Sequence, residues 1–306
     1  MEQGESVLIA GGTGLIGDRL CQILTQNGYR VMLLSRKKHK NGNIPVYEWN
    51  VEQGTIDENA ILRADYIINL AGAGIADKRW SEERKKHIIE SRTQSAALLF
   101  DTCKRLNHFP KAYLSASAIG YYGDRGNEIL DEEDEAGKGF LSESCTAWEN
   151  AAQIFSNENI RTVIYRIGIV LSTQGGALVE TIKPMRFGLC SYFGNGRQYF
   201  SWIHIDDICN MILRGLEDDD MTGTFNAVAP NPSSNKEFSK TLRKCYPKFT
   251  ILAPVPTFMM RLIMGEMADI VLTSSIVSSA KIEQQGFVFQ YPVLEMAFND
   301  VLFREI

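Results

Sequence analysis

The sequence predicts an α/β protein in which a doubly wound parallel sheet is followed by a smaller, mainly helical C-terminal lobe. Over the first two thirds of the chain, short apolar runs alternate with amphipathic helical patterns, which is typical of βαβ units. A glycine-rich turn joins the first apolar run to the first helical pattern. Beyond about Ile169 the alternation loosens, and from Ile251 onward the pattern is mainly helical. We therefore expect residues 1–230 to form the sheet domain and residues 250–306 a small C-terminal domain.

Each expected strand is a short run of apolar residues, as in parallel strands that are buried on both faces. Because strands that alternate with helices form right-handed crossovers, we expect helices on both faces of this sheet. The runs are Val7–Ala10, Val31–Leu34, Tyr66–Leu70, Ala112–Ser115 and Thr162–Tyr165.

The first helix is expected to begin near Leu15, because apolar residues from there recur on one face until Asn27-Gly28 supplies a stop. Longer helical patterns cover Glu82–Arg105 and Ser142–Phe155. Two such helices could pack against their copies in a homodimer, and a monomer is equally compatible with the sequence.

Composition excludes several classes of function. The chain has 306 residues, a formal net charge of −5 and 44% hydrophobic residues, which is ordinary for a globular protein. The slightly negative net charge gives no positive electrostatic field that would attract a polyanion. We therefore expect neither nucleic acid nor an anionic membrane as a partner. The six cysteines form no CxxC pair and no zinc spacing, so we expect no metal site. Reduced thiols and the absence of a signal-peptide pattern favour a cytoplasmic protein.

The glycine-rich turn has the spacing GxGxxG, directly after a buried strand and at the start of an amphipathic helix. In this context one glycine permits a tight turn, one lets the backbone approach a pyrophosphate, and one lets helix and strand pack closely. The helix N-terminus adds N–H groups and a positive dipole. The sequence therefore predicts a dinucleotide site on a Rossmann βαβ unit, in contact with Gly11, Thr13, Gly14, Leu15, Ile16 and Gly17.

The end of the second strand predicts which dinucleotide binds. An NAD site places Asp or Glu there, about 20 residues past the loop, to bind the ribose 2′-hydroxyl. This chain instead has Ser35-Arg36-Lys37-Lys38. Because Arg36 and Ser35 would donate charge-assisted hydrogen bonds to a 2′-phosphate, we expect NADP(H) rather than NAD(H). The alternative is a basic surface turn.

Several motifs resemble those of the short-chain dehydrogenase/reductase superfamily, in its extended, epimerase-like branch. They are the glycine loop, Asn69-Leu70-Ala71-Gly72 and Ser115-Ala116-Ser117. Residues 194–207, Asn226–Pro230 and Gly265–Ala268 are similar to the signatures of one subgroup, the atypical reductases with an extra C-terminal domain. Some members of that subgroup carry the labels cell-division inhibitor or nucleotide-sugar epimerase. The resemblance covers nearly the whole chain.

The resemblance implies further cofactor contacts. Leu70, Ala71 and Gly72 would line the adenosine side, Arg92 would reach the cofactor from below the sheet, and Val170 would pass the nicotinamide. Without the resemblance, Arg92 is an exposed helix cation and the segment around Val170 is a buried strand.

Catalysis in this superfamily uses a Ser or Thr, a Tyr, and a Lys four residues after the Tyr. Ser117 matches the serine, but Leu141 and Cys145 fall at the tyrosine and lysine positions, and no Tyr in the chain has Lys four residues later. Tyr121 and Tyr122 follow Ser117 closely and are the candidate proton donors, with packing or a substrate wall as the alternative.

His204 can titrate near neutral pH, but its strand-like surroundings favour a structural role. We expect Asp206 and Asp207 to cap the helix that follows.

Nucleotide-sugar epimerases carry an arginine that binds the substrate pyrophosphate, and the resemblance places Phe200 at that position. Arg197 could substitute for it. Gln198, Phe200 and Trp202 therefore suggest a more apolar small substrate, or else a core between two lobes.

These observations predict an atypical NADP(H)-dependent reductase, an oxidoreductase or epimerase that acts on a small carbonyl or alcohol. The alternative is a non-catalytic module that senses NADP(H) or binds a partner, because the Tyr/Lys pair is absent.

Overall fold

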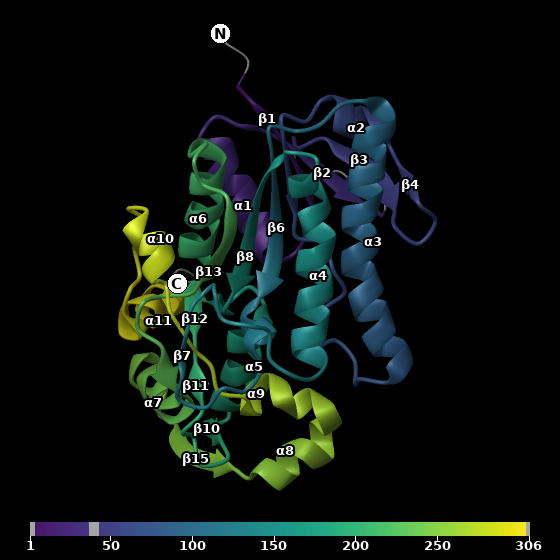
Figure 1. Cartoon of the computed structure of the whole chain (residues 1–306). Helices are drawn as coiled ribbons and strands as arrows, with labels where there is room; N and C mark the ends of the chain where they lie inside the picture. Colours follow the sequence, from purple (N-terminus) through teal and green to yellow (C-terminus); the bar gives the residue numbers. More distant parts are fainter. Residues whose placement is uncertain (1–3, 37–42, 304–306) are drawn as a thin grey trace.

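The computed structural model describes residues 4–36 and 43–303. Its centre is an eight-stranded sheet in the order β13-β8-β6-β5-β1-β2-β3-β4 (Figure 1). Every neighbouring pair is parallel except β3 and β4. The strand order reverses at β1, which makes a crevice at the carboxyl ends of β1 and its neighbours. The strands are β1 (Ser6–Ala10), β2 (Arg30–Ser35), β3 (Val46–Asn50), β4 (Thr55–Ile56), β5 (Tyr66–Asn69), β6 (Ala112–Ala118), β8 (Arg161–Ile167) and β13 (Gly223–Ala227).

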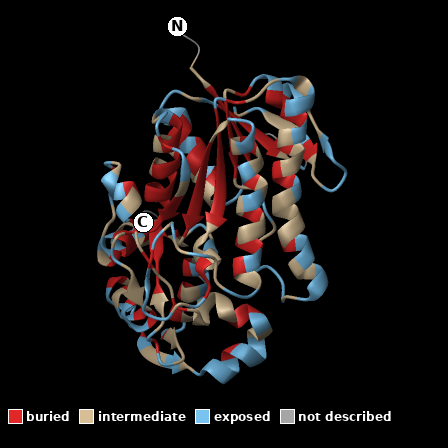
Figure 2. Ribbon diagram, viewed as in Figure 1, coloured by how far each residue is buried: buried red, intermediate tan, exposed pale blue. Residues whose placement is uncertain are grey.

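Helices cover both faces of the sheet, and the central strands between them are buried (Figure 2). Strand β1 shows why, because its side chains alternate between two hydrophobic cores. Val7 and Ile9 enter the core under α1 (Leu15–Gln26) and α6 (Ile205–Glu217). Leu8 and Ala10 enter the core on the opposite face. That face is covered by α2 (Glu58–Leu62), α3 (Glu82–Leu106) and α4 (Phe140–Asn157).

A second lobe lies beyond the carboxyl edge of the sheet (Figure 1). Its core joins α5 (Gly176–Met185), α7 (Asn235–Cys245) and α11 (Leu294–Phe303). Small two-stranded sheets connect the loops. The predicted fold class is therefore confirmed. The remaining elements are β7 (Ile129–Leu130), β9 (Ile169–Leu171), β10 (Leu189–Phe193), β11 (Tyr199–Phe200), β12 (Trp202–His204), β14 (Ser233–Ser234), β15 (Ile251–Val255), β16 (Ile276–Val277), η1 (Ile119–Tyr122), α8 (Thr257–Met264), η2 (Gly265–Ala268), α9 (Asp269–Leu272) and α10 (Ala280–Gln284).

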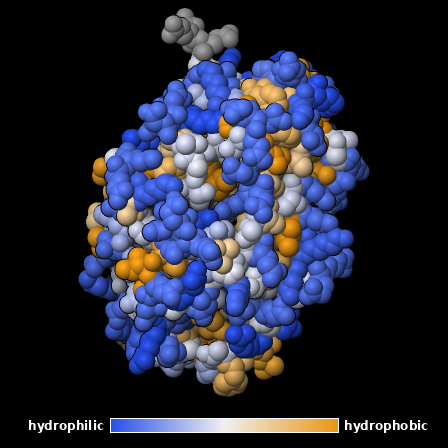
Figure 3. Space-filling view, viewed as in Figure 1, coloured by the Kyte–Doolittle hydropathy of each residue, from blue (hydrophilic) through white to orange (hydrophobic). Residues whose placement is uncertain are grey.

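Helix α8 exposes apolar side chains, including Phe258 and Leu262, and apolar surface gathers at the lower end of the molecule, where α8 lies (Figure 3). Arg79 Nη2 donates to Leu262 O at 3.3 Å, and Lys85 Nζ lies 2.5 Å from Glu266 Oε2. These contacts join the C-terminal lobe to the start of α3. No helix within 4–36 and 43–303 is both long and apolar enough to cross a membrane.

Candidate cofactor and active site

The glycine loop leads from β1 into α1 and turns sharply at Gly11. Gly11 has a φ of +84°, and a Cβ atom there would lie 2.7 Å from the backbone carbon of Leu70. Gly14 N donates to Gly11 O at 3.0 Å and closes the turn. Only glycine accepts both the positive φ and this close approach to the end of β5.

The start of α1 is open to an anion. Its N-cap is Gly14, which makes no side-chain hydrogen bond to the first turn. Since first-turn N–H groups have no acceptor within a helix, those of Leu15, Ile16 and Gly17 are suited to phosphate oxygens. A Cβ at Gly17 would lie 2.4 Å from Gly11 O, so the helix packs directly on the loop. These residues therefore fit the pyrophosphate of a dinucleotide.

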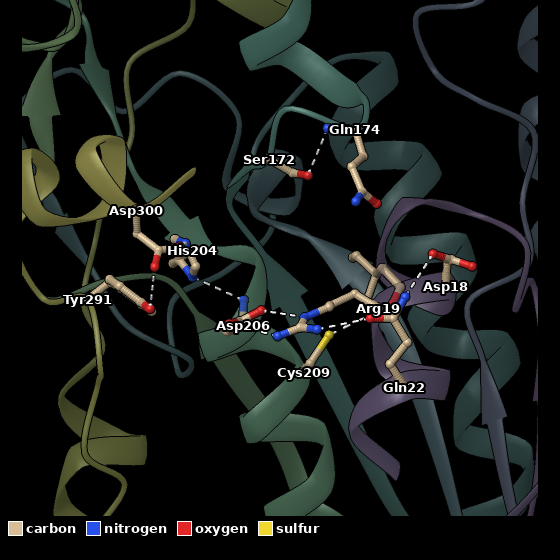
Figure 4. Close-up of polar contacts among 11 residues, drawn as sticks. Asp18, Arg19, Gln22, Ser172, Gln174, His204, Asp206, Cys209, Tyr291 and Asp300 are labelled. Atoms are coloured by element: carbon tan, nitrogen blue, oxygen red, sulfur yellow. Dashed lines mark hydrogen bonds and ion pairs between the residues drawn. The ribbon is translucent and has the colours of Figure 1, made fainter. Parts of the chain in front are cut away.

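Polar contacts behind the loop fix α1 to α6 (Figure 4). Arg19 Nε and Nη2 donate to the two carboxylate oxygens of Asp206 at 2.7 and 3.1 Å. Cys209 Sγ lies 3.8 Å from Ile16 O. The helix that presents N–H groups to a ligand is thus bonded at more than one point to its neighbour.

His204, which is buried, caps α6 with its ring. Asp206 N donates to His204 Nδ1 at 3.1 Å, and His204 Nε2 lies 3.1 Å from Asp300 Oδ2. The expectation that Asp206 and Asp207 cap this helix is therefore wrong. An imidazole nitrogen already accepts the first-turn N–H, and the Asp207 carboxylate instead accepts from the backbone of Gln290 and Tyr291.

Ser35 and Arg36 lie where β2 ends, at the same edge as the glycine loop. β2 pairs with β1, and a Cβ at Gly12 would lie 2.3 Å from Leu33 Cδ2, so loop and strand are in direct contact. Ser35 is half-buried and Arg36 is exposed. Lys37 and Lys38 lie outside the described residues.

The backbone after β5 is held by a buried asparagine that the sequence analysis did not assign. Asn69 Oδ1 accepts from Ala71 N at 3.1 Å, and its Nδ2 donates to Tyr113 Oη at 2.9 Å and to Ser95 Oγ at 3.1 Å. Asn69 thereby fixes the predicted adenosine-side segment Leu70–Gly72.

Arg92 lies against this segment rather than on an exposed helix face. Its Nη1 donates to Ala73 O at 3.1 Å, and its Cζ lies 4.6 Å from the Trp148 ring centre. A Cβ at Gly72 would be 3.1 Å from that Cζ. Arg92 therefore lies beside Gly72, and its contact with the cofactor stays a prediction.

Val170 lies in β9 opposite Ile203 of β12. A Cβ at Gly176 would lie 3.1 Å from Leu15 Cδ2 and 4.0 Å from Val170 O. The structure therefore brings Val170 near the first residue of α1, although its contact with nicotinamide stays a prediction.

Ser117 lies at the end of β6 and is bonded to a buried ion pair. Ser117 Oγ donates to Glu149 Oε1 at 2.6 Å. Arg166 Nε and Nη2 donate to the two oxygens of Glu149, each at 2.9 Å, with Glu149 11% and Arg166 5% exposed at their side chains. Although burial lowers it, hydrogen bonding and charge from Glu149 raise the pKa of Arg166 above its usual value.

The two candidate tyrosines differ in environment. Tyr122 is fully buried, accepts from Arg166 Nη1 at 2.9 Å and donates to Asn226 Oδ1 at 2.7 Å. Tyr121 is only partly buried, and Arg166 Cζ lies 3.5 Å from its ring centre. The Tyr122 hydroxyl is thus used in hydrogen bonds within the protein, whereas the Tyr121 ring stacks on the guanidinium of Arg166.

Leu141 and Cys145 lie at the start of α4, where they pack on η1. A Cβ at Gly120 would be 3.3 Å from Leu141 Cβ and 3.6 Å from Cys145 Sγ. Burial raises the pKa of Cys145 to about 12, so this thiol stays protonated at neutral pH.

The predicted substrate residues do not share one environment. Trp202 is fully buried and donates from Nε1 to Asn231 O at 3.0 Å, and Phe200 packs on Phe238 with ring centres 5.7 Å apart. Both belong to the core of the second lobe, whereas the alternative to a substrate contact was a core between two lobes. Gln198 lines a cavity of about 400 Å³ together with Arg197, so among the three it lies nearest to open space.

Comparison with known proteins places these features in a family. Residues 7–227 match the model of the NAD dependent epimerase/dehydratase family, and residues 255–301 match a domain of unknown function, DUF1731. An epimerase family protein of Staphylococcus aureus (strain MRSA252) is 35% identical over 299 residues, 96% of this chain and 98% of the relative. The chloroplastic SDR39U1 homolog of Arabidopsis thaliana, also an epimerase family protein, is 33% identical over 98% of this chain and 88% of its own length.

The same relationship holds in three dimensions. The crystal structure of human epimerase family protein SDR39U1 (isoform 2) with NADPH superposes with a TM-score of 0.87 at 30% identity, over 97% of this chain and 98% of the human one. The resemblance found in the sequence is confirmed: this chain belongs to the NAD-dependent epimerase/dehydratase family and carries a DUF1731 domain at its C-terminal end.

Proposed function

We propose that this chain binds NADP(H) at the glycine loop and acts as an oxidoreductase or epimerase on a small carbonyl or alcohol. The observation that carries the proposal is the open N-terminus of α1 in a loop that excludes Cβ atoms, with Arg36 at the end of β2 where NAD sites have a carboxylate. The NADPH in the crystal structure of the human relative supports the choice of cofactor.

Different residues along the carboxyl edge of the sheet would hold different parts of this cofactor. First-turn N–H groups of α1 bind the pyrophosphate, Ser35 and Arg36 bind the 2′-phosphate, and Leu70–Gly72 line the adenosine side. Arg92 would reach the cofactor from its place beside Gly72, and Val170 would contact the nicotinamide. When bound, the nicotinamide ring donates or accepts a hydride at its C4 atom.

The protein's own groups orient the substrate and move the proton. Ser117 is buried and its hydroxyl donates to Glu149, so in this proposal its oxygen accepts a hydrogen bond from a substrate hydroxyl at the end of β6. Tyr121 supplies or accepts the proton, because Tyr122 is buried with its hydroxyl already bonded on both sides.

Replacement of Tyr121 by Phe is expected to lower turnover about 100-fold or more, the usual contribution of a general acid. Ser117→Ala should also lower turnover because the substrate oxygen loses its position. Loss of NADPH absorbance is measured with a panel of small aldehydes and ketones, and NADPH binding should stay within about twofold, as expected for residues that do not hold the cofactor. Tyr47→Phe, in β3, serves as control. Unchanged turnover in Ser117→Ala and Tyr121→Phe contradicts the assignment.

A second function, NADP(H) sensing without turnover, is favoured by one observation: Leu141 and Cys145 fill the positions of the missing Tyr/Lys pair with apolar packing. In that case NADPH binds and raises the melting temperature, but no carbonyl in the panel oxidises it.

A further inference from the structure

Two arginines of α3 converge on the loop that follows β5. Arg84 Nη2 donates to Gly74 O at 2.6 Å, and Arg92 Nη1 donates to Ala73 O at 3.1 Å. Two guanidinium groups thus bind consecutive carbonyl oxygens, beside Gly72. Arg84 lies in the first turn of α3, after the N-cap Ser81, where the helix dipole disfavours a positive charge.

This positive charge has little compensation within the protein. Arg84 has one carboxylate nearby, that of Asp77 at 3.6 Å, and Asp77 is 68% exposed. In the part of the chain that the structure describes, no ion pair includes Arg92. Burial lowers the pKa of Arg92, and the charge of Arg84 adds to that effect. Buried charge without a counter-ion is destabilising. These two arginines are therefore suited to bind an anionic group of a ligand.

Two buried N–H donors, one on Arg84 and one on the tryptophan that Arg92 contacts, also lack an acceptor. Arg84 Nε and Trp148 Nε1 are buried and have no hydrogen-bond partner among the described residues. Trp148 is 7% exposed, and Arg92 stacks on its ring at 4.6 Å. Native proteins satisfy nearly all buried donors, so two orphans beside two cations indicate a missing acceptor.

The cluster lies at the edge of the sheet where the cofactor site was built. Gly72 is in contact with Arg92, and Leu70, two residues earlier, lies against Gly11 of the glycine loop. Trp148 follows Cys145 on α4 and precedes Glu149, which binds Ser117. Arg92 thus contacts a residue two positions along the chain from a contact of the glycine loop, and Trp148 comes from the same helix as Glu149.

We propose that Arg84, Arg92 and Trp148 form a binding site for an anionic oxygen group, a phosphate or carboxylate, of a ligand in this crevice. The proposal deepens the proposed function and rests on it for the identity of the ligand. Guanidinium groups present paired donors that match such oxygens. The group belongs either to the phosphates of the cofactor or to an acidic substrate, and binding measurements distinguish these sources.

The test compares Arg84→Gln with Lys86→Gln by isothermal titration calorimetry. Lys86 is an exposed cation two residues further along α3, paired with Glu90 at 3.7 Å, so both variants lose one charge from one helix. The probes are NADPH, inorganic pyrophosphate, and inorganic phosphate added to NADPH-saturated protein. Loss of a hydrogen bond to a charged group should weaken binding by about tenfold to a hundredfold in Arg84→Gln, and by less than about twofold in Lys86→Gln.

Each result has a defined meaning. Weaker binding of NADPH and pyrophosphate in Arg84→Gln assigns the site to the cofactor, whereas weaker binding of phosphate alone assigns it to an acidic substrate. Trp148→Phe should weaken the same probe, because it keeps the ring but removes Nε1–H. Equal affinities of Arg84→Gln and Lys86→Gln for all probes overturn the inference. A wild-type protein that binds pyrophosphate but not NADPH contradicts the proposed cofactor, while the comparison of variants still tests the anion site.

Discussion

Replacement of Glu149 by Ala should lower the free energy of unfolding by about 3–5 kcal/mol, as for other buried ion pairs that lose one partner. Glu149 accepts from two nitrogens of Arg166 at 2.9 Å and from Ser117 at 2.6 Å. Its removal leaves a buried guanidinium without its carboxylate and a buried hydroxyl without its acceptor. Urea denaturation, monitored by circular dichroism, measures the loss.

The matched control is Glu180→Ala. Glu180 pairs with Lys183 at 2.6 Å on α5, but both side chains are more than half exposed, and exposed pairs contribute about 0–1 kcal/mol. If the two variants lose equal stability, the pair of Glu149 and Arg166 is not the buried structural centre that its geometry indicates.

Replacement of Gly17 by Ala should weaken NADPH binding by about 100-fold or more, the effect expected when binding groups move by an ångström. The new Cβ would lie 2.4 Å from Gly11 O and 2.6 Å from Gly12 Cα. Both are backbone atoms, so no side chain can rotate away, and α1 must move from the loop. The N–H groups that α1 presents would then no longer meet the pyrophosphate.

Fluorescence titration with NADPH measures this effect. Gln22→Ala, an exposed change on the same helix, should bind NADPH like the wild type. Gly17→Ala that remains folded and binds within about twofold of wild type would show that close packing of α1 on the loop is not needed for the cofactor.

The central strands could be predicted because each is buried on both faces and is a continuous apolar run. Strands β1, β2, β5, β6 and β8 contain the five expected runs almost completely. Strands β3, β4 and β13 were not predicted. They lie toward the two edges of the sheet, and β3 is half-buried with polar residues such as Glu48, so strand pairing rather than local pattern determines them.

The glycine loop could be predicted because its function depends on neighbouring residues in the chain. The ion pair of Glu149 and Arg166 could not, because its partners come from α4 and β8 and meet only in the folded protein. The helix cap was missed because aspartates are commoner at that position, whereas here His204 Nδ1 accepts the first-turn N–H. Phe200 and Trp202 remained ambiguous, since aromatic residues line pockets and fill cores equally well.

The affinities of NADPH and NADH for the wild type and for Arg36→Ala test the central claim most directly. If Arg36 binds the 2′-phosphate, the wild type should bind NADPH at least about tenfold more tightly than NADH, which is the gain in affinity expected from one charge-assisted hydrogen bond. Arg36→Ala should lose most of that preference by weakening NADPH alone. Equal affinity of the wild type for the two dinucleotides would contradict the assignment of this chain to NADP(H).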